Sequence, residues 1–287
     1  MNHPAELSVH SYLRKAIDGK TSMSKEVIKA ICDDVAAALE KQFNSGPRDE
    51  FRLRMSNIGR PKCQLWFDKN YPETDIQKPT AFMLNMLMGD WTEAIFKGIL
   101  RAAKVEFEDN DRVTLKLEGG AEVSGEYDMI MDGAVDDVKS ASPWSYMNKF
   151  VDAETLAKGD SFGYIPQLIG YAQAADKKVG GWWVVNKANG HHKYVSAKHV
   201  DVDEELAKMR ATYDYLENDM PLQRQYTDEP ETYRKKLTGN RVLCRECNFC
   251  SFKKACWPDY KELPSRTYQG KLTPPTVAYT KLKEIQL

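Results

Sequence analysis

The centre of the chain alternates polar and apolar residues in short segments separated by turn residues, and this pattern restricts the fold more than any other feature. Alternation with a period of two is typical of half-buried strands, and Asp-Gly or Asn-Gly between two such segments indicates a hairpin. The expected strands occupy residues 112–117, 122–131, 134–139, 182–186 and 194–196. Asp132-Gly133 and Asn189-Gly190 would close two of the hairpins.

Helical periodicity lies on both sides of these strands. Helices are expected twice in the first fifty residues, once from about Ser56 through Phe67, and at 81–103, 160–176 and 203–218. In the second of them Val27, Ile31 and Val35 recur at helical spacing, and Cys32 is expected in the core beside this stripe. Strands in the middle with helices before and after them predict an α/β fold with a mixed central sheet flanked by helices.

The composition excludes several broad classes of protein. There are 41 basic and 42 acidic residues, so the chain is neither a polycation nor an acidic tail. With 42% hydrophobic residues it is too apolar for intrinsic disorder. The sequence has no secretory signal and no apolar run near the roughly 20 residues that span a bilayer. We expect a cytoplasmic protein without membrane contact, whose cysteines stay reduced.

Two carboxylates and a lysine are expected to converge on the hairpin of residues 125–140. Side chains alternate faces on a strand, so Asp137 and Lys139 point the same way, while Asp136 points the other way. The turn at Asp132-Gly133 brings Asp128 opposite that pair. Carboxylates beside a phosphate suit Mg²⁺, which binds through one or two carboxylates and keeps several waters. A lysine there can orient or deprotonate the attacking water and offset transition-state charge.

Residues on either side of the hairpin extend this pattern. Glu93 lies four residues after Gly89 on an expected helix that can aim its carboxylate at the hairpin. Gln167 and Tyr171 stand four residues apart, on one face of a later helix.

The order Gly-x-x-x-acid, Gly-x-x-Asp, Asp-x-Lys and Gln-x-x-x-Tyr resembles the motif series of the PD-(D/E)xK nuclease superfamily, in its RecB-like exonuclease branch. The likeness spans roughly residues 56–260. It implies a restriction-endonuclease-like core in which Glu93, Asp128 and Asp137 hold Mg²⁺ or Mn²⁺, with the backbone carbonyl of Val138 as a further ligand. Lys139 would be the catalytic lysine, and Gln167 with Tyr171 would contact the active site or DNA. The chain departs from the usual pattern at two positions: many relatives have His in place of Glu93, and Glu is more usual than Asp137.

Four cysteines crowd into the run VLCRECNFCSFKKACWP, as Cys244, Cys247, Cys250 and Cys256. Such bunching indicates a metal site. Zinc sites usually set two close pairs a dozen or more residues apart, which this compact run does not do. RecB-like nucleases with an iron–sulfur cluster, including the CRISPR-associated adaptation nucleases, carry one cysteine before the nuclease core and a C-x2-C-x5-C triplet after it. The resemblance implies a [4Fe–4S] cluster on Cys63, Cys247, Cys250 and Cys256. Cys244 is the alternative fourth ligand, and zinc is the alternative metal.

The net charge of −1 hides local asymmetry. Residues 233–256 carry seven basic side chains and one acid, and residues 51–69 carry five basic side chains and one acid. If the cluster joins Cys63 to the triplet, these segments would form one positive patch that can follow phosphates. Its expected DNA contacts are Arg60, Lys62, Arg241, Arg245, Lys253 and Lys254.

These expectations describe a metal-dependent DNA exonuclease acting on single strands or ends in the cytoplasm, which is the host cytoplasm if a phage encodes it. A non-catalytic DNA-end-binding adaptor and a structure-specific endonuclease are the alternatives. The expected organisation is a helical region at 1–50, the nuclease core at 51–230 and a cysteine-cluster segment at 231–287 that packs back on the core.

Overall fold

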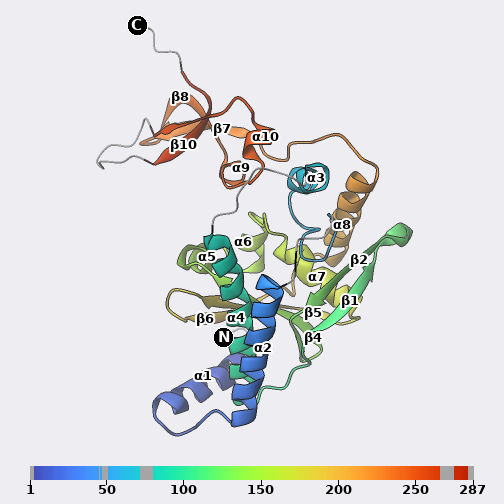
Figure 1. Ribbon diagram of the computed structural model, residues 1–287, viewed down its shortest axis with the longest axis vertical. Helices are drawn as coiled ribbons and strands as arrows, with labels where there is room; N and C mark the ends of the chain where they lie inside the picture. The colour runs from blue at the N-terminus through green and yellow to red at the C-terminus, as the bar shows by residue number, and fades with distance from the viewer. Residues whose placement is uncertain (1–2, 45, 47–50, 72–79, 266–274, 284–287) are drawn as a thin grey trace. The chain divides into compact units, whose positions relative to one another are not determined.

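The computed structural model describes residues 3–44, 46, 51–71, 80–265 and 275–283, and it divides the chain into two compact units (Figure 1). The first unit contains residues 1–60 and 78–218, and the second contains 61–77 and 219–287. The segment around Cys63 therefore belongs with the C-terminal residues. This division differs from the three expected segments, since the N-terminal helices share a unit with the central sheet. The expected boundary at residue 50 falls outside the described residues.

The N-terminal helices pack on the long helix α4. Helices α1 (Pro4–Ile17) and α2 (Lys25–Phe43) both contact α4 (Ala81–Ala102), and α2 runs beside it (Figure 1). Ile31 faces Gly98, where an added Cβ would lie only 2.3 Å from the Ile31 side chain. Cys32 is exposed. The expectation that it lies in the core was wrong because the seam with α4 follows Ile31, and successive helical residues point about 100° apart.

The central sheet of the first unit is mixed, with the strand order β3-β4-β5-β6. Strands β3 (Met129–Met131) and β4 (Ala134–Ala141) are antiparallel, β4 and β5 (Lys178–Asn186) are parallel, and β5 and β6 (His192–Ser196) are antiparallel. The expected strand at 122–131 is split, because β2 (Glu122–Tyr127) pairs instead with β1 (Asp111–Lys116). The mixed α/β fold predicted from the sequence is confirmed.

Helices cover both faces of this sheet. On one face Val135, Trp182 and Val184 pack with Leu168 and Ile169 of α7 (Tyr164–Ala174). On the other face Val138, Trp183 and Tyr194 pack with residues of α1 and α4. Alternating strand residues supply the two cores, as expected for a sheet buried on both sides. The crossover from β4 to β5 passes through α5 (Pro143–Asn148), α6 (Ala153–Ala157) and α7, and α8 (Val202–Glu217) packs on α7.

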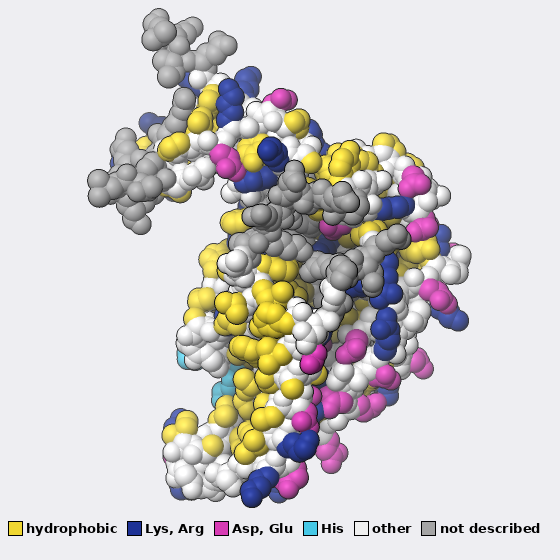
Figure 2. Space-filling model, in the orientation of Figure 1, with side chains coloured by type: hydrophobic (Ala, Val, Ile, Leu, Met, Phe, Trp, Pro, Cys, Tyr) yellow, Lys and Arg dark blue, Asp and Glu magenta, His cyan; other side chains and the backbone are white. Residues whose placement is uncertain are grey.

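The outer surface over α2 and α4 is apolar, as the yellow side chains of Figure 2 show. Leu84, Met88 and Ile95 of α4 are all exposed, and their spacing places them on one face of the helix. Among the described residues, no helix is long and apolar enough to cross a membrane.

The second unit consists of an antiparallel sheet and three short helices. Its sheet has the order β7-β8-β10-β9, from Asp228–Tyr233, Lys236–Leu243, Thr276–Lys281 and Lys261–Pro264. The helices are α3 (Lys62–Asn70), α9 (Arg245–Asn248) and α10 (Lys253–Cys256). The expected helix from Ser56 through Phe67 therefore begins later, since the chain reaches helical geometry only after Pro61. The C-terminal sheet was not predicted.

Candidate active site and cysteine cluster

The hairpin of β3 and β4 places Asp128 directly against the middle of β4. Met129 pairs with Asp136 and Met131 with Ala134, so Asp128 comes level with Asp137. The Val138 backbone N–H donates to Asp128 Oδ2 at 2.7 Å. The expected convergence of the two carboxylates is therefore present in the fold. Val138 pairs with Trp183 of the neighbouring strand, and the expected role of its carbonyl as a ligand stays a prediction.

Asp137 and Lys139 form a buried ion pair on the same side of β4. Lys139 Nζ lies 2.7 Å from both carboxylate oxygens of Asp137, although only Oδ1 accepts a hydrogen bond of good geometry. The Asp137 side chain is 3% exposed and that of Lys139 is 18% exposed. The carboxylate thus has one oxygen atom left without a hydrogen bond in a largely dry setting, where a cation would be stabilised.

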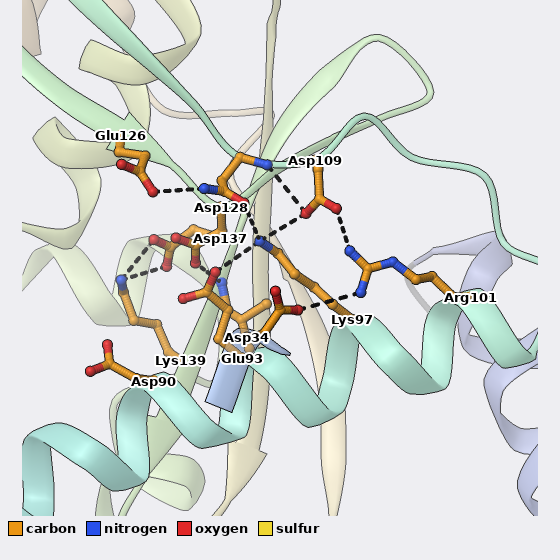
Figure 3. A network of polar contacts seen from close by, with 12 residues as sticks. Asp34, Asp90, Glu93, Lys97, Arg101, Asp109, Glu126, Asp128, Asp137 and Lys139 are labelled. Carbon is orange, nitrogen blue, oxygen red and sulfur yellow. Dashed lines mark hydrogen bonds and ion pairs between the residues drawn. The ribbon is translucent and has the colours of Figure 1, made fainter. Parts of the chain in front are cut away.

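Glu93 approaches the hairpin from α4, as expected, but a second lysine accompanies it (Figure 3). Lys97 stands four residues later on the same helix face, and its Nζ lies 2.9 Å from Glu93 Oε1. The Lys97 side chain is only 4% exposed, whereas Glu93 keeps 30%. Glu93 also acts electrostatically on Asp137. One region therefore contains the carboxylates of Glu93, Asp128 and Asp137 and the ammonium groups of Lys97 and Lys139.

Lys97 links the carboxylates to a second group of charges that the sequence analysis did not include. Its Nζ also lies 3.2 Å from Asp109 Oδ1, and Asp109 forms an ion pair with Arg101. Arg101 in turn lies 3.5 Å from Asp34 of α2 (Figure 3). The sequence carried a signal for this network, since Lys97 interrupts the apolar run AIFKGIL at the i+4 position from Glu93.

Burial and mutual repulsion raise the pKa values of the carboxylates. Burial, followed by the charge of Asp128, raises the pKa of Glu93 to about 7. Burial, followed by the charge of Asp137, raises the pKa of Asp128 to about 7, and burial also raises the pKa of Asp137. Burial alone would lower the pKa of Lys139, but the charges of Asp137 and Asp128 outweigh it and raise that pKa. The lysine therefore stays protonated while Glu93 and Asp128 bind protons near neutral pH.

These shifts predict a pH dependence of stability that Asp128 controls. The pKa of Asp128 rises from 3.8 to about 7 on folding, so between these values the native state binds a proton that the unfolded state lacks. The free energy of unfolding should then fall as pH rises through this window. Asn cannot titrate. The free energy of unfolding of Asp128→Asn should therefore rise by about 1 kcal/mol or more relative to that of the wild type between pH 5 and pH 7.

Urea unfolding in EDTA at the two pH values would measure this difference. Taking the difference between variant and wild type cancels the opposite trend of the buried His3 and His192, whose pKa values burial lowers. A gap between variant and wild type that stays constant over this pH range would contradict the assignment.

Gln167 and Tyr171 lie beside the carboxylates on α7. Gln167 Nε2 donates to the Tyr171 hydroxyl at 3.4 Å, so the two share one helix face, as expected. Burial raises the pKa of Tyr171 to about 12, and Asp137 and Asp128 act on it in the same direction. Gly125 of β2 makes this approach possible, because a Cβ there would lie 2.7 Å from the Tyr171 ring.

Asp132 and Asp136 of the hairpin have structural positions. Asp132 occupies the turn with a positive φ of 52°. Asp136 points to the opposite face from Asp137, where its Oδ1 accepts hydrogen bonds from the Tyr194 hydroxyl and the Gly181 N–H, both at 2.8 Å. Both placements agree with the sequence prediction.

The predicted cysteines come together in the second unit. Gln64, next to Cys63 on α3, lies 4.0 Å from Cys250 Sγ, and Phe67 of the same helix stacks on Phe252 with ring centroids 5.3 Å apart. The helix that carries Cys63 therefore lies beside the C-terminal triplet. All six cysteines are free thiols.

Electrostatic coupling shows which thiols are neighbours. Cys63 is coupled to Cys256, and Cys250 is coupled to both of them. Cys247 is coupled to Cys256 and also to Cys244, which acts on it through a hydrogen bond. Burial is the main cause that raises the pKa values of Cys63 and Cys250, and that raises the pKa of Cys247 to about 12. Five buried or half-buried thiols therefore lie near one another in the second unit, with Cys63 close enough to the triplet to act on it electrostatically.

The predicted DNA contacts divide between the two units. Arg60 belongs to the first unit and is exposed, while the other five belong to the second. Acids accompany two of these five: Arg241 lies 2.6 Å from Asp228, and Lys253 lies 2.5 Å from Glu262. Lys62 is half-buried, and Arg245 and Lys254 are exposed on α9 and α10. The cationic surface of the second unit is therefore weaker than the residue count suggests.

Within the parts of the chain that the structure describes, no three His, Cys, Asp or Glu side chains stand together in a way that could hold a metal ion. Binding at either site would require the side chains to turn toward the ion. At the carboxylates, the ion would have to replace Lys97 as the partner of Glu93.

No family model matches the chain, and no curated protein matches it. Among solved structures, the crystal structure of SSO0001 aligns over 78% of this chain and 94% of its own, with 12% sequence identity and a TM-score of 0.45. At this TM-score and identity, the likeness establishes neither a shared fold family nor a shared function.

Proposed function

We propose that the protein is a divalent-metal-dependent DNA exonuclease with a restriction-endonuclease-like core of the RecB-like kind. The observation that carries the proposal is the convergence of Glu93, Asp128, Asp137 and Lys139, which come from three separate segments. A protein that only binds DNA has no need to gather three carboxylates whose burial is costly.

Glu93, Asp128 and Asp137 would hold Mg²⁺ or Mn²⁺. Their donor set suits a hard cation, and the Asp137 oxygen without a hydrogen bond gives the cation a ready partner. When bound, the ion would act as a Lewis acid and lower the pKa of water beside the scissile phosphate. Their raised pKa values mean that protons compete with the metal for these carboxylates, so metal affinity should rise with pH.

Lys139 would act as a cation that donates hydrogen bonds. Its raised pKa keeps the ammonium protonated at neutral pH, so this lysine is suited to orient water and offset phosphate charge, and it is a poor base. Asp137 fixes its position through the 2.7 Å ion pair. Tyr171, with Gln167 bonded to its hydroxyl, would contact the substrate or the water on the α7 side.

A [4Fe–4S] cluster would be held by Cys63, Cys247, Cys250 and Cys256. Cys244 is the alternative fourth ligand, and zinc is the alternative metal. The raised pKa values of the Cys63, Cys247 and Cys250 thiols support this assignment, because a cationic centre would stabilise the thiolates that burial disfavours. The bound cluster would fix α3 to the C-terminal segment in a structural role.

A nuclease assay tests this proposal. The wild-type chain is incubated with end-labelled linear single-stranded DNA in Mg²⁺, in Mn²⁺ and in EDTA, beside Asp137→Asn. We expect metal-dependent release of short products by the wild type and loss of at least about a hundredfold in the variant. A circular single strand of the same sequence separates exonuclease from endonuclease activity. Binding without cleavage in either metal would favour the adaptor alternative, and equal activity of the variant would refute the site.

A further inference from the structure

A stack of aromatic rings leads from Lys139 to the surface of the first unit. Lys139 Nζ lies 5.3 Å from the centroid of the Tyr164 ring. Phe162 stacks on Tyr164 with ring centroids 5.5 Å apart and planes only 11° apart. Phe162 is 54% exposed, although Tyr164 is mostly covered. The stack therefore joins the proposed catalytic lysine to a ring that is open to solvent.

Cations surround this stack. Lys149 Nζ lies 5.3 Å from the Phe162 centroid, and the exposed Arg60 acts electrostatically on Tyr164. Asp137 and Asp160 also act electrostatically on Tyr164, and the oxygens of Asp160 accept hydrogen bonds from the backbone N–H groups of Tyr164 and Ile165 at 3.0 and 2.8 Å. Asp160 is thereby committed to the start of α7. Lys149 and Arg60 place positive charge near the rings, which suits a phosphate.

The loop that carries Phe162 is held in place. Gly163 has a φ of 74°, and its Cα lies so close to Gly59 that a Cβ on either glycine would clash with the other's backbone. Asp160 also holds this turn, because its carboxylate accepts the two backbone hydrogen bonds at the start of α7. A ring on a fixed loop loses little conformational entropy when a ligand stacks on it, so the exposed Phe162 is preorganised for a flat partner.

We propose that Phe162 and Lys149 form a nucleotide subsite beside the scissile position. This inference rests on the proposed nuclease function and specifies its substrate. Phe162 stacks on an unpaired base, and Lys149 contacts the adjoining phosphate, with Arg60 nearby. A base in a duplex already stacks on its neighbours and presents no free face, so the subsite selects single-stranded DNA or a frayed end. Stacking of a base on an aromatic side chain is sequence-tolerant, because every base has a π face.

Binding measured without cleavage tests the subsite. Fluorescence anisotropy in Ca²⁺ gives the Kd of wild type, Phe162→Ala and Phe162→Trp for a labelled single strand and for a blunt duplex. Phe162→Ala should raise the Kd for the single strand about tenfold, with little change for the duplex, and Phe162→Trp should restore it. Phe43→Ala is the matched control, since Phe43 is an exposed phenylalanine, 59% exposed, at the end of α2. Lys149→Ala should make the slope of log Kd against log salt concentration shallower by the amount that corresponds to about one phosphate contact.

The outcomes separate this inference from the function on which it rests. Unchanged single-strand affinity in Phe162→Ala, or an equal loss for single strand and duplex, would overturn the subsite while wild-type cleavage remains. A wild type that neither binds nor cleaves DNA would instead refute the nuclease itself. Thermal unfolding of each variant checks that the loop substitution leaves the fold intact, and rescue by Trp excludes a general defect.

Discussion

Replacement of Lys139 by Met should lower the single-turnover rate of DNA cleavage about a thousandfold, while binding of the strand changes little. Groups that stabilise charge developing in a transition state typically contribute two to three orders of magnitude in rate. Lys139 is largely buried, paired with Asp137 and protonated, so its charge acts where water screens it weakly. Met keeps the length and apolar stem of the side chain and removes the ammonium alone.

A second variant separates charge from basicity. Lys139→Arg retains a cation that cannot act as a base, so it should keep more activity than Lys139→Met if the charge matters. Lys178→Met is the matched control, because Lys178 is an exposed lysine at the start of β5. Rates measured with excess enzyme on an end-labelled strand would check these expectations. Activity of Lys139→Met within tenfold of wild type would contradict the assigned role.

The hairpin was predictable because its information is local. A period-two pattern with an Asp-Gly turn fixes which residues oppose each other, and one register shift would have placed Asp137 on the wrong face. The observed pairing of Met129 with Asp136 is the register that the turn implied. The approach of Glu93 to the hairpin and the shared helix face of Gln167 and Tyr171 were also expected from helical spacing. The strand order of the sheet was not predicted.

The parts that were not predicted depend on tertiary contacts. The C-terminal sheet has short, half-exposed strands, and Pro230 lies within β7, so neither alternation nor apolar runs marked it. Cys32 was misplaced because periodicity alone does not determine which side of the apolar stripe meets α4. Lys97 was missed because a sequence pattern does not show whether a single charged residue is buried, as Lys97 is.

The buried charges of the first unit also bear on the proposal that a near-neutral chain acts on DNA. Lys97 and Lys139 compensate most of the charge of Glu93, Asp128 and Asp137 in the absence of metal. A phosphate approaching this site therefore does not meet three uncompensated negative charges. Net charge over the whole chain says little about this local balance, since buried pairs are screened far less than surface charges.

The second large effect is expected at the cysteines. Anaerobically purified wild-type protein should absorb broadly near ~400 nm and contain about four iron atoms per chain. Cys63→Ser should lose most of this iron and absorbance, because the Cys63 thiol belongs to one group with Cys250 and Cys256. Thermal unfolding should also occur at least about 5 °C lower, because the cluster would no longer fix α3 to the C-terminal segment.

Cys244→Ser identifies the fourth ligand in the same experiment. Cys244 precedes α9, and if Cys63 is the fourth ligand, replacement of Cys244 should leave the iron content near the wild-type value. Cys32→Ser is the matched control, because Cys32 is an exposed thiol of the first unit. Loss of iron in Cys244→Ser with retention in Cys63→Ser would reverse the assignment, since the cluster would then be held by the C-terminal run alone. A colourless wild type with stoichiometric zinc would replace the iron–sulfur proposal by a zinc site on the same thiols, because the convergence of Cys63 with the triplet does not depend on the metal.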